Sequence, residues 1–384
     1  MIIPRATLED HLTASLERSP VVALLGPRQC GKTTLARRLQ KRHAAAYFDL
    51  EDPRDVARLQ NPVLVLTELT GLVILDEIQL RPDLMPLLRV LADRTPLPCR
   101  FLLLGSASPD LSRHSSESLA GRIEFVEMGG FTLDEVESST HNALWLRGGF
   151  PDSFLATSDA DSMMWRENFI RTFLERDMPR LGIQIPALTL RRFWMMVAHH
   201  HGQIWSGSEI GASLGVSHPT TRKYLDLLTG AFVLRQLPPW FENLGKRTVK
   251  SPKVYVRDTG LLHALLNISN HDELSGHPKL GASWEGFVVE QLLSVLPERH
   301  TYFWATHGGA ELDVLYVAGA KRYGFECKYA DAPRTTKSMR VALEDLKLEH
   351  LWIVHPGDSE YPLDERITVI PAKRIPELAR GLKG

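Results

Sequence analysis

The chain has 384 residues, of which 43% are hydrophobic and 24% are charged, and these shares are those of an ordinary folded protein. They exclude a disordered chain and a coiled-coil rod. The 45 Lys and Arg residues nearly balance the 46 Asp and Glu residues. A nucleic-acid site therefore has to be a local patch, and no membrane partner is expected.

Cysteine usage and the N-terminal sequence indicate the compartment. The three cysteines, Cys30, Cys99 and Cys327, lack CxxC spacing, which argues against disulfide bonds and against a zinc site. The N-terminal residues do not resemble a secretion signal, and no apolar run approaches the roughly 18 residues of a membrane span. We therefore expect a cytoplasmic protein.

Short apolar runs separated by amphipathic helical stretches fill the first third of the chain. They cover residues 21–25, 46–50, 72–75, 100–104 and 122–126. Continuous apolar strands that alternate with helices are typical of a parallel sheet covered on both faces. Residues 1–130 are therefore predicted to form an α/β domain.

Three further domains are predicted after it. Helical periodicity at residues 161–177 and 186–201 predicts a helical lid over 131–205. Residues 206–270 contain two short helices joined by a glycine turn, followed by two strands that flank a basic loop, which is the pattern of a winged helix. A polar linker at 270–278 opens the last α/β domain, 271–384, with a helix from about residue 282 and strands near 301, 313 and 325.

A phosphate-binding motif follows the first apolar strand. The sequence from Gly26 to Thr33 matches GxxxxGK[ST] and precedes a helical pattern. Such a loop points backbone N–H groups at the phosphates of a nucleotide, while its lysine reaches the β and γ phosphates and its Ser or Thr binds Mg2+. We expect ATP to be bound by Gly26, Pro27, Arg28, Gln29, Cys30, Gly31, Lys32, Thr33 and Thr34.

Two acidic residues end the apolar strand at 72–75. Asp76 is predicted to bind Mg2+ together with Thr33, and Glu77 to act as the base that deprotonates the attacking water. Ser106 follows another strand and is predicted to contact the γ phosphate, with an ordinary turn serine as the alternative. Arg113 or Arg122 is a candidate for the arginine that a neighbouring subunit inserts into this site, with a solvated or structural arginine as the alternative for each.

The chain resembles AAA-type ATPases of bacteria and archaea whose ATPase module is fused to a C-terminal domain formerly of unknown function. The resemblance lies in GPRQCGKT (26–33), LVILDEIQ (72–79), FLLLGSAS (101–108) and SLAGRIEF (118–125), and in GGFP, FLERD, KVYVRDTGL and WEGFVVEQL further on. It implies an ATPase core with an extra strand between the two nucleotide motifs, a winged helix and a restriction-endonuclease-like final domain. It also implies a homo-oligomer in many relatives.

Acidic and basic residues converge in the last domain. Asp313 and Glu326 are predicted ligands of Mg2+ or Mn2+, and Lys328, on the same strand face as Glu326, is predicted to activate a water. This arrangement resembles that of restriction-endonuclease-like nucleases. Helical periodicity nominates Glu285 as a further metal ligand and indicates a solvated Glu290. A scaffold that keeps these residues without cleaving DNA is the alternative.

A basic patch is predicted on the winged helix. It contains Arg222 and Lys223 on the second helix, and Lys246, Arg247, Lys250 and Lys253 on the wing. These positions suit a helix that enters the major groove of DNA while the wing contacts phosphates. A solvated surface or a protein contact is the alternative for the same residues.

The leading hypothesis is therefore a cytoplasmic Mg2+-dependent ATPase coupled to a DNA transaction, in which the final domain binds or cuts DNA. The alternative is an ATP-driven switch whose C-terminal domain binds a protein or DNA partner without cleavage.

Overall fold

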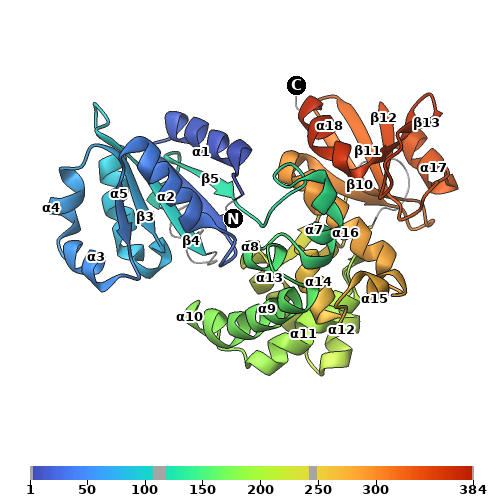
Figure 1. The fold of residues 1–384 in the computed structure, drawn as a ribbon, viewed down its shortest axis with the longest axis horizontal. Helices are drawn as coiled ribbons and strands as arrows, with labels where there is room; N and C mark the ends of the chain where they lie inside the picture. Colours follow the sequence, from blue (N-terminus) through green and yellow to red (C-terminus); the bar gives the residue numbers. More distant parts are fainter. Residues whose placement is uncertain (1–2, 107–117, 242–248, 383–384) are drawn as a thin grey trace. The chain divides into compact units, whose positions relative to one another are not determined.

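The computed structural model describes residues 3–106, 118–241 and 249–382. These residues form two compact units, one made of 1–130 with 230–232 and the other of 131–229 with 233–384 (Figure 1). No helix of the described residues is long and apolar enough to cross a bilayer.

The first unit is built on a five-stranded parallel sheet, in the order β2-β3-β4-β1-β5. The strands are β1 (Val21–Gly26), β2 (Ala46–Asp49), β3 (Gly71–Asp76), β4 (Cys99–Ser106) and β5 (Ile123–Glu127). The helices are α1 (Ala6–Arg18), α2 (Lys32–His43), α3 (Pro53–Arg58), α4 (Pro62–Thr67) and α5 (Met85–Ala92). The predicted α/β class with a parallel sheet is confirmed.

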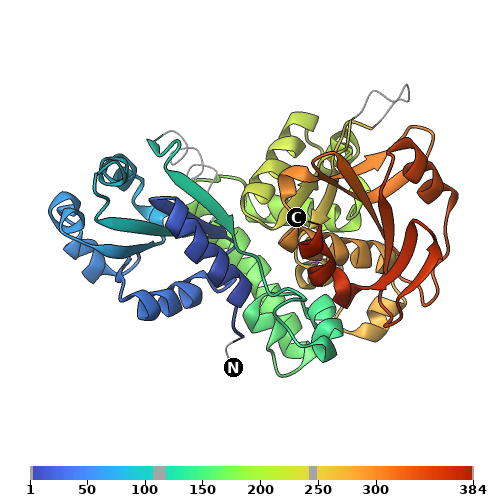
Figure 2. The ribbon, with the colours of Figure 1, turned by 90° about the horizontal axis from the view of Figure 1, so that it is seen from above.

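Both faces of this sheet are covered, which explains the apolar runs. Alternate residues of β1, β3 and β4 pack against the apolar side of α5 in one core cluster. Helices α1 and α2 lie on the other face (Figure 2). Because all the strands run parallel, Gly26, Asp76 and Ser106 end at the same edge of the sheet, where open α/β sheets bind ligands.

The second unit begins with helices. They are α7 (His141–Arg147), α8 (Pro151–Phe154), α9 (Asp159–Thr172), α10 (Met178–Arg180) and α11 (Ala187–His199). The helix predicted over 161–177 is present, and its last five residues, 173–177, form a π-helical turn between α9 and α10.

A small antiparallel sheet follows, in the order β6-β8-β7. It combines β6 (Gln203–Ile204), β7 (Leu234–Leu237) and β8 (Lys253–Val256), with α12 (Gly207–Leu214) and α13 (His218–Gly230) between β6 and β7. Next come α14 (Thr259–Leu265) and α15 (His271–Ser275). The linker predicted at 270–278 is therefore partly helical, because Asn270 caps α15 and Leu274 is buried.

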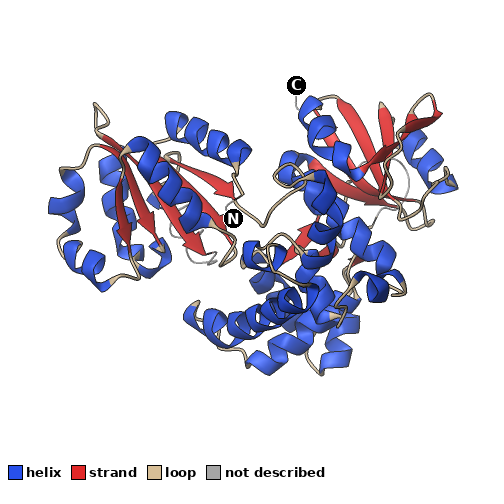
Figure 3. Ribbon diagram, viewed as in Figure 1, coloured by secondary structure: helices blue, strands red, loops and turns tan. Residues whose placement is uncertain are grey.

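The chain ends in a six-stranded mixed sheet, in the order β13-β14-β12-β11-β10-β9 (Figure 3). The strands are β9 (Thr301–Ala305), β10 (Glu311–Ala318), β11 (Lys321–Cys327), β12 (His350–His355), β13 (Tyr361–Asp364) and β14 (Ile367–Pro371). Helix α17 (Lys337–Asp345) packs on one face, while α16 (Leu280–Val295) and α18 (Ile375–Gly381) pack together on the other side (Figure 1).

Asp258 joins the helical segment to the strand-helix segment that follows β8. Its carboxylate accepts hydrogen bonds from the backbone N–H groups of Gly149, at 2.8 Å, and of Leu261, at 2.9 Å. A Cβ atom at Gly148 would lie 2.1 Å from that carboxylate, so only glycine fits there. Burial raises the pKa of Asp258. The GGFP and RDTGL motifs therefore form one structural contact.

We predict that Asp258→Ala lowers the free energy of unfolding of the second unit by about 2–3 kcal/mol, because it leaves two buried N–H groups without their acceptor. Urea unfolding measures the change. Asp272→Ala, at an exposed position, serves as the control and is expected to cost less than about 0.5 kcal/mol. Equal effects of the two substitutions would contradict this role for Asp258.

A candidate nucleotide site and a carboxylate cluster

The loop between β1 and α2 has the geometry of a phosphate cradle. Gln29 and Gly31 have positive φ angles of 63° and 102°, which turn the backbone into the start of α2. A Cβ atom at Gly26 would lie 2.0 Å from the carbonyl oxygen of Met128, so this position also requires glycine. The buried Lys32 ammonium donates to the carbonyl oxygens of Gly26, at 3.0 Å, and Pro27, at 2.7 Å.

Asp76 lies beside this loop and is almost fully buried. Its Oδ2 atom accepts hydrogen bonds from the hydroxyl groups of Thr33, at 2.8 Å, and Tyr47, at 2.5 Å. Its Oδ1 atom accepts one from the backbone N–H of Glu77, at 2.9 Å. A hydroxyl and a carboxylate side by side are the oxygen ligands that Mg2+ prefers, so Thr33 and Asp76 fit the predicted ion.

Tyr47 on β2 is a residue of this site that the sequence reasoning missed. The guanidinium of Arg37 stacks over its ring in a cation–π contact, with the central carbon of the guanidinium 3.5 Å from the ring centroid. Burial and the hydrogen bond to Asp76 raise the pKa of the phenol, so Tyr47 stays a neutral donor. The apolar sequence of β2 does not indicate that Tyr47 contacts a carboxylate. The contact with Asp76 arises only because β2 lies beside β3 in the sheet.

The side chains of Gln79 and Arg28 lie beside the carboxylate of Glu77. Its carboxylate contacts the side-chain amide of Gln79 and lies 4.0 Å from the Arg28 guanidinium. Gln79 also donates to the Ser106 hydroxyl, at 3.0 Å, so Glu77 and Ser106 meet through one amide. Burial raises the pKa of Glu77, which favours the role of a proton acceptor. The structure therefore brings together the predicted site residues of both nucleotide motifs.

Arg122, one of the two candidate arginines, is not part of this group. Arg122 precedes β5 and so lies at the amino ends of the parallel strands, opposite the phosphate loop. Its guanidinium pairs with Asp93, with 2.5 Å between Nε and Oδ1. Arg122 is therefore not a residue of its own nucleotide site. Arg113 lies outside the described residues.

The second group of predicted residues lies in the six-stranded sheet. Lys328 pairs with Glu326 at 2.8 Å, as expected for side chains on one strand face. Asp313 sits where a β-bulge in β10 shifts the register between Leu312 and Leu315. Bulges of this kind redirect side chains, and here Asp313 Oδ2 accepts a hydrogen bond from the backbone N–H of Cys327, at 2.9 Å.

Lys253 enters the same cluster, against the prediction that it contacts DNA phosphates. It is only 2% exposed, and its ammonium group contacts Glu311 and lies 2.9 Å from Glu285 and 3.3 Å from Asp313. Burial alone would lower its pKa, but the surrounding carboxylates raise it well above the ordinary value. Lys253 is therefore a buried cation and not a surface one.

The carboxylates of the cluster are shifted toward their neutral forms. Burial, opposed by Lys253, raises the pKa of Glu285 to about 7. Burial together with Asp313 raises the pKa of Glu326 to about 8. Within the described residues, no group of three or more His, Cys, Asp or Glu side chains has the arrangement of a metal site. The predicted set of Glu285, Asp313 and Glu326 is therefore not arranged around one ion.

Glu290 is not the solvated acid that helical periodicity indicated. It is mostly buried and pairs with Arg235 of β7 and with Arg257, whose Nε lies 3.3 Å away. These arginines lower the pKa of Glu290 despite its burial, which opposes them. The periodicity failed because a neighbouring strand, and not solvent, covers this side of α16.

The predicted basic patch is only partly described. Arg222 and Lys223 are exposed on α13, and Arg222 pairs with Asp226 on the same helix at 3.1 Å. Lys250 is exposed next to β8. Lys246 and Arg247 lie outside the described residues.

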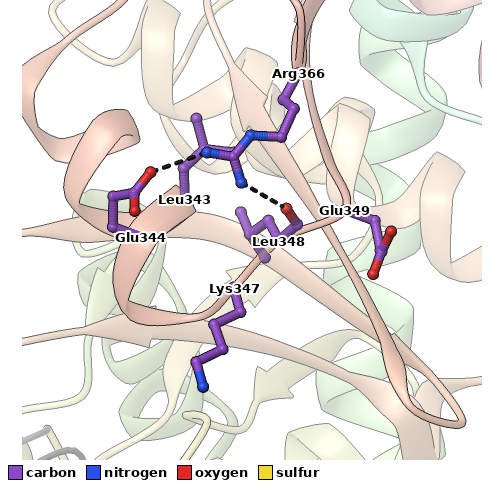
Figure 4. Close-up of a pocket in the computed structure, with 6 residues that line it drawn as sticks. All are labelled: Leu343, Glu344, Lys347, Leu348, Glu349 and Arg366. Carbon is purple, nitrogen blue, oxygen red and sulfur yellow. Dashed lines mark hydrogen bonds and ion pairs between the residues drawn. The ribbon is translucent and has the colours of Figure 1, made fainter.

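A surface pocket is lined by none of these residues (Figure 4). It is lined by residues of the α17–β12 turn together with Arg366. Arg366 donates to Glu344, at 2.9 Å, and to the carbonyl oxygen of Leu348, so its charge is already paired.

Comparisons with known proteins agree with the geometry of the first unit. Family models match an AAA domain at residues 18–137, a domain of unknown function (DUF8612) at 139–272 and a further one (DUF4143) at 280–375. The chain thus contains an AAA-type P-loop ATPase domain.

Two uncharacterized proteins, of Mycobacterium bovis and Mycobacterium tuberculosis, are each 52% identical to this chain over 375 residues. The match covers 98% of this chain and 85% of either relative. A Walker-type ATPase of Pyrococcus abyssi shares the fold at 17% identity and a TM-score of 0.50, over 69% of this chain and 96% of that one.

We predict that Tyr47→Phe destabilises the nucleotide-free first unit by about 1.5–3 kcal/mol, since the buried Asp76 carboxylate loses a donor. Saturating Mg2+ and ATP should reduce this loss, because the ion brings positive charge to the same carboxylate. Urea unfolding with and without the ligands measures both effects. Tyr302→Phe, which removes an exposed hydroxyl, is the control, and a loss no larger than the control's would contradict the assignment.

Proposed function

Because the chain belongs to the same family as the two mycobacterial proteins and contains an AAA domain, we propose that it is a Mg2+-dependent ATPase coupled to a DNA transaction. The observation that carries the proposal is the meeting of Lys32, Thr33, Asp76 and Glu77 at one edge of the parallel sheet.

Each of these residues has a distinct task in hydrolysis. Lys32 moves from the carbonyl oxygens of its own loop to the phosphates, and the backbone N–H groups of residues 28–34 bind the phosphate oxygens. Thr33 and Asp76 would hold Mg2+, which would withdraw negative charge from the phosphates. Glu77 accepts a proton from the attacking water, and Ser106 lies beside it to contact the γ phosphate.

Substitution of the two central residues separates binding from hydrolysis. Lys32→Ala should abolish ATP binding, measured by fluorescence titration with a labelled nucleotide, because the phosphates lose their main positive charge. Glu77→Gln should bind ATP with unchanged affinity while turnover falls by about 100-fold or more, because the amide cannot take the proton. Wild-type turnover in either variant would reject the assignment.

The coupling to DNA rests on the second unit. The order α11, β6, α12, α13, β7, β8 supports the proposal of a winged helix, and α13 carries the exposed Arg222 and Lys223. A helix with exposed basic residues in this position suits the major groove of DNA. We further propose that the active form is a homo-oligomer in which Arg122, at the strand ends opposite its own phosphate loop, completes the nucleotide site of a neighbouring subunit.

We predict that single-stranded, duplex or branched DNA raises the ATPase rate, and that Arg222→Glu with Lys223→Glu removes most of this stimulation without changing the basal rate. Arg191→Glu with Arg192→Glu, on exposed positions of α11, changes the charge equally and serves as the control. If no DNA form stimulates the wild type, the coupling to DNA is rejected and the ATP-driven switch with a protein partner is favoured.

The last domain is proposed to have the restriction-endonuclease-like fold. In its order, α16, β9, β10, β11, α17, β12, Asp313 and Glu326 lie on the adjacent strands β10 and β11, and Lys328 directly follows β11. Cleavage with Mg2+ or Mn2+ at these residues is one consequence of that fold, and DNA or partner binding without cleavage is the other. Loss of metal-dependent cleavage in both Glu326→Ala and Lys328→Ala would support the first.

A further inference from the structure

We propose that the ammonium group of Lys253 occupies the cation position of the C-terminal carboxylate cluster, so that this domain holds no divalent metal and does not cleave DNA by a metal-dependent reaction. The inference deepens the proposed endonuclease-like fold of the last domain and rests on that part of the proposal. It is independent of ATP hydrolysis in the first unit.

The geometry places one positive charge where three carboxylates meet. The Lys253 ammonium contacts Glu311 and lies 2.9 Å from Glu285 Oε1 and 3.3 Å from Asp313 Oδ1. Glu285 comes from α16, and Glu311 and Asp313 come from β10. Acidic oxygens from a helix and a strand here surround an ammonium group, so a lysine supplies the positive charge that a divalent ion would bring to such a cluster.

The lysine is fixed in this place by its strand. All four residues of β8 are buried, and β8 is the central strand of its sheet, paired on both edges with β6 and β7. Tyr255, two residues further on, donates its hydroxyl to the same Glu285 oxygen at 2.7 Å. The paired backbone of β8 fixes the Cα atom of Lys253, and withdrawal of its buried ammonium would break its ion pairs with Glu285 and Asp313.

One carboxylate oxygen shows what the site would offer without the lysine. Glu326 is 5% exposed, and among the described residues its Oε2 atom has no hydrogen-bond partner. Its Oε1 atom is paired with Lys328. Removal of the Lys253 charge would leave Glu285 and Asp313 without their shared cation, and buried carboxylates without a counter-charge favour binding of a hard cation.

The test measures Mn2+ binding to the full chain without nucleotide, by isothermal titration calorimetry and by the Mn2+ electron paramagnetic resonance signal. We expect the wild type and Asp313→Asn to bind Mn2+ equally, because the carboxylate cluster of the wild type holds no Mn2+. Lys253→Met keeps the length of the side chain without its charge, and it should gain one Mn2+ site that binds at least about tenfold more tightly than any Mn2+ binding by the wild type. Adding Asp313→Asn to this variant should abolish the site. Mn2+ should also raise the melting temperature of Lys253→Met but not of the wild type.

Three outcomes decide the inference. Wild-type Mn2+ binding that Asp313→Asn abolishes would overturn it, while leaving the endonuclease-like fold supported. A folded Lys253→Met protein without Mn2+ binding would also overturn it, since no cation position would then exist. If Lys253→Met does not fold, the comparison of the wild type with Asp313→Asn alone decides. An ATPase rate measured in parallel keeps these outcomes separate from failure of the proposed ATPase, because Lys253 lies outside the nucleotide site.

Discussion

A carboxylate removed from water needs either hydrogen-bond donors or a positive charge, and this protein compensates its buried acids in three ways. Asp258 receives backbone N–H groups and joins two segments. Asp76 receives hydroxyl donors, from Thr33 and Tyr47, which leave room for an ion to replace them. Glu285 receives the charge of Lys253 itself. The chemistry available at each place follows from this choice.

The difference separates the two candidate sites. Hydroxyl donors around Asp76 can be exchanged for a magnesium ion at little cost, because they are themselves oxygen ligands or lie beside one. An ammonium group held by a buried strand cannot be exchanged in the same way. The first unit is thus built to bind and release a charged ligand, whereas the acidic residues of the last domain stabilise a contact between β8 and its neighbours.

The sequence predicted the features that depend on neighbours along the chain. The phosphate loop from Gly26 to Thr33 and the acids after β3 are local patterns, and apolar runs located the strands. Features that depend on distant partners were missed. Tyr47 was interpreted as part of an apolar strand, because only the strand order brings it to Asp76. Lys253 was interpreted as a surface cation, because only packing in the folded protein brings it to Asp313.

The most direct test is the number of Mn2+ ions bound per chain in the presence of a non-hydrolysable ATP analogue, counted by equilibrium dialysis. The account predicts one ion, lost in Thr33→Ala and retained in Asp313→Asn, because only the nucleotide site exchanges its donors for metal. Two ions per chain, with one lost in Asp313→Asn, would contradict the account.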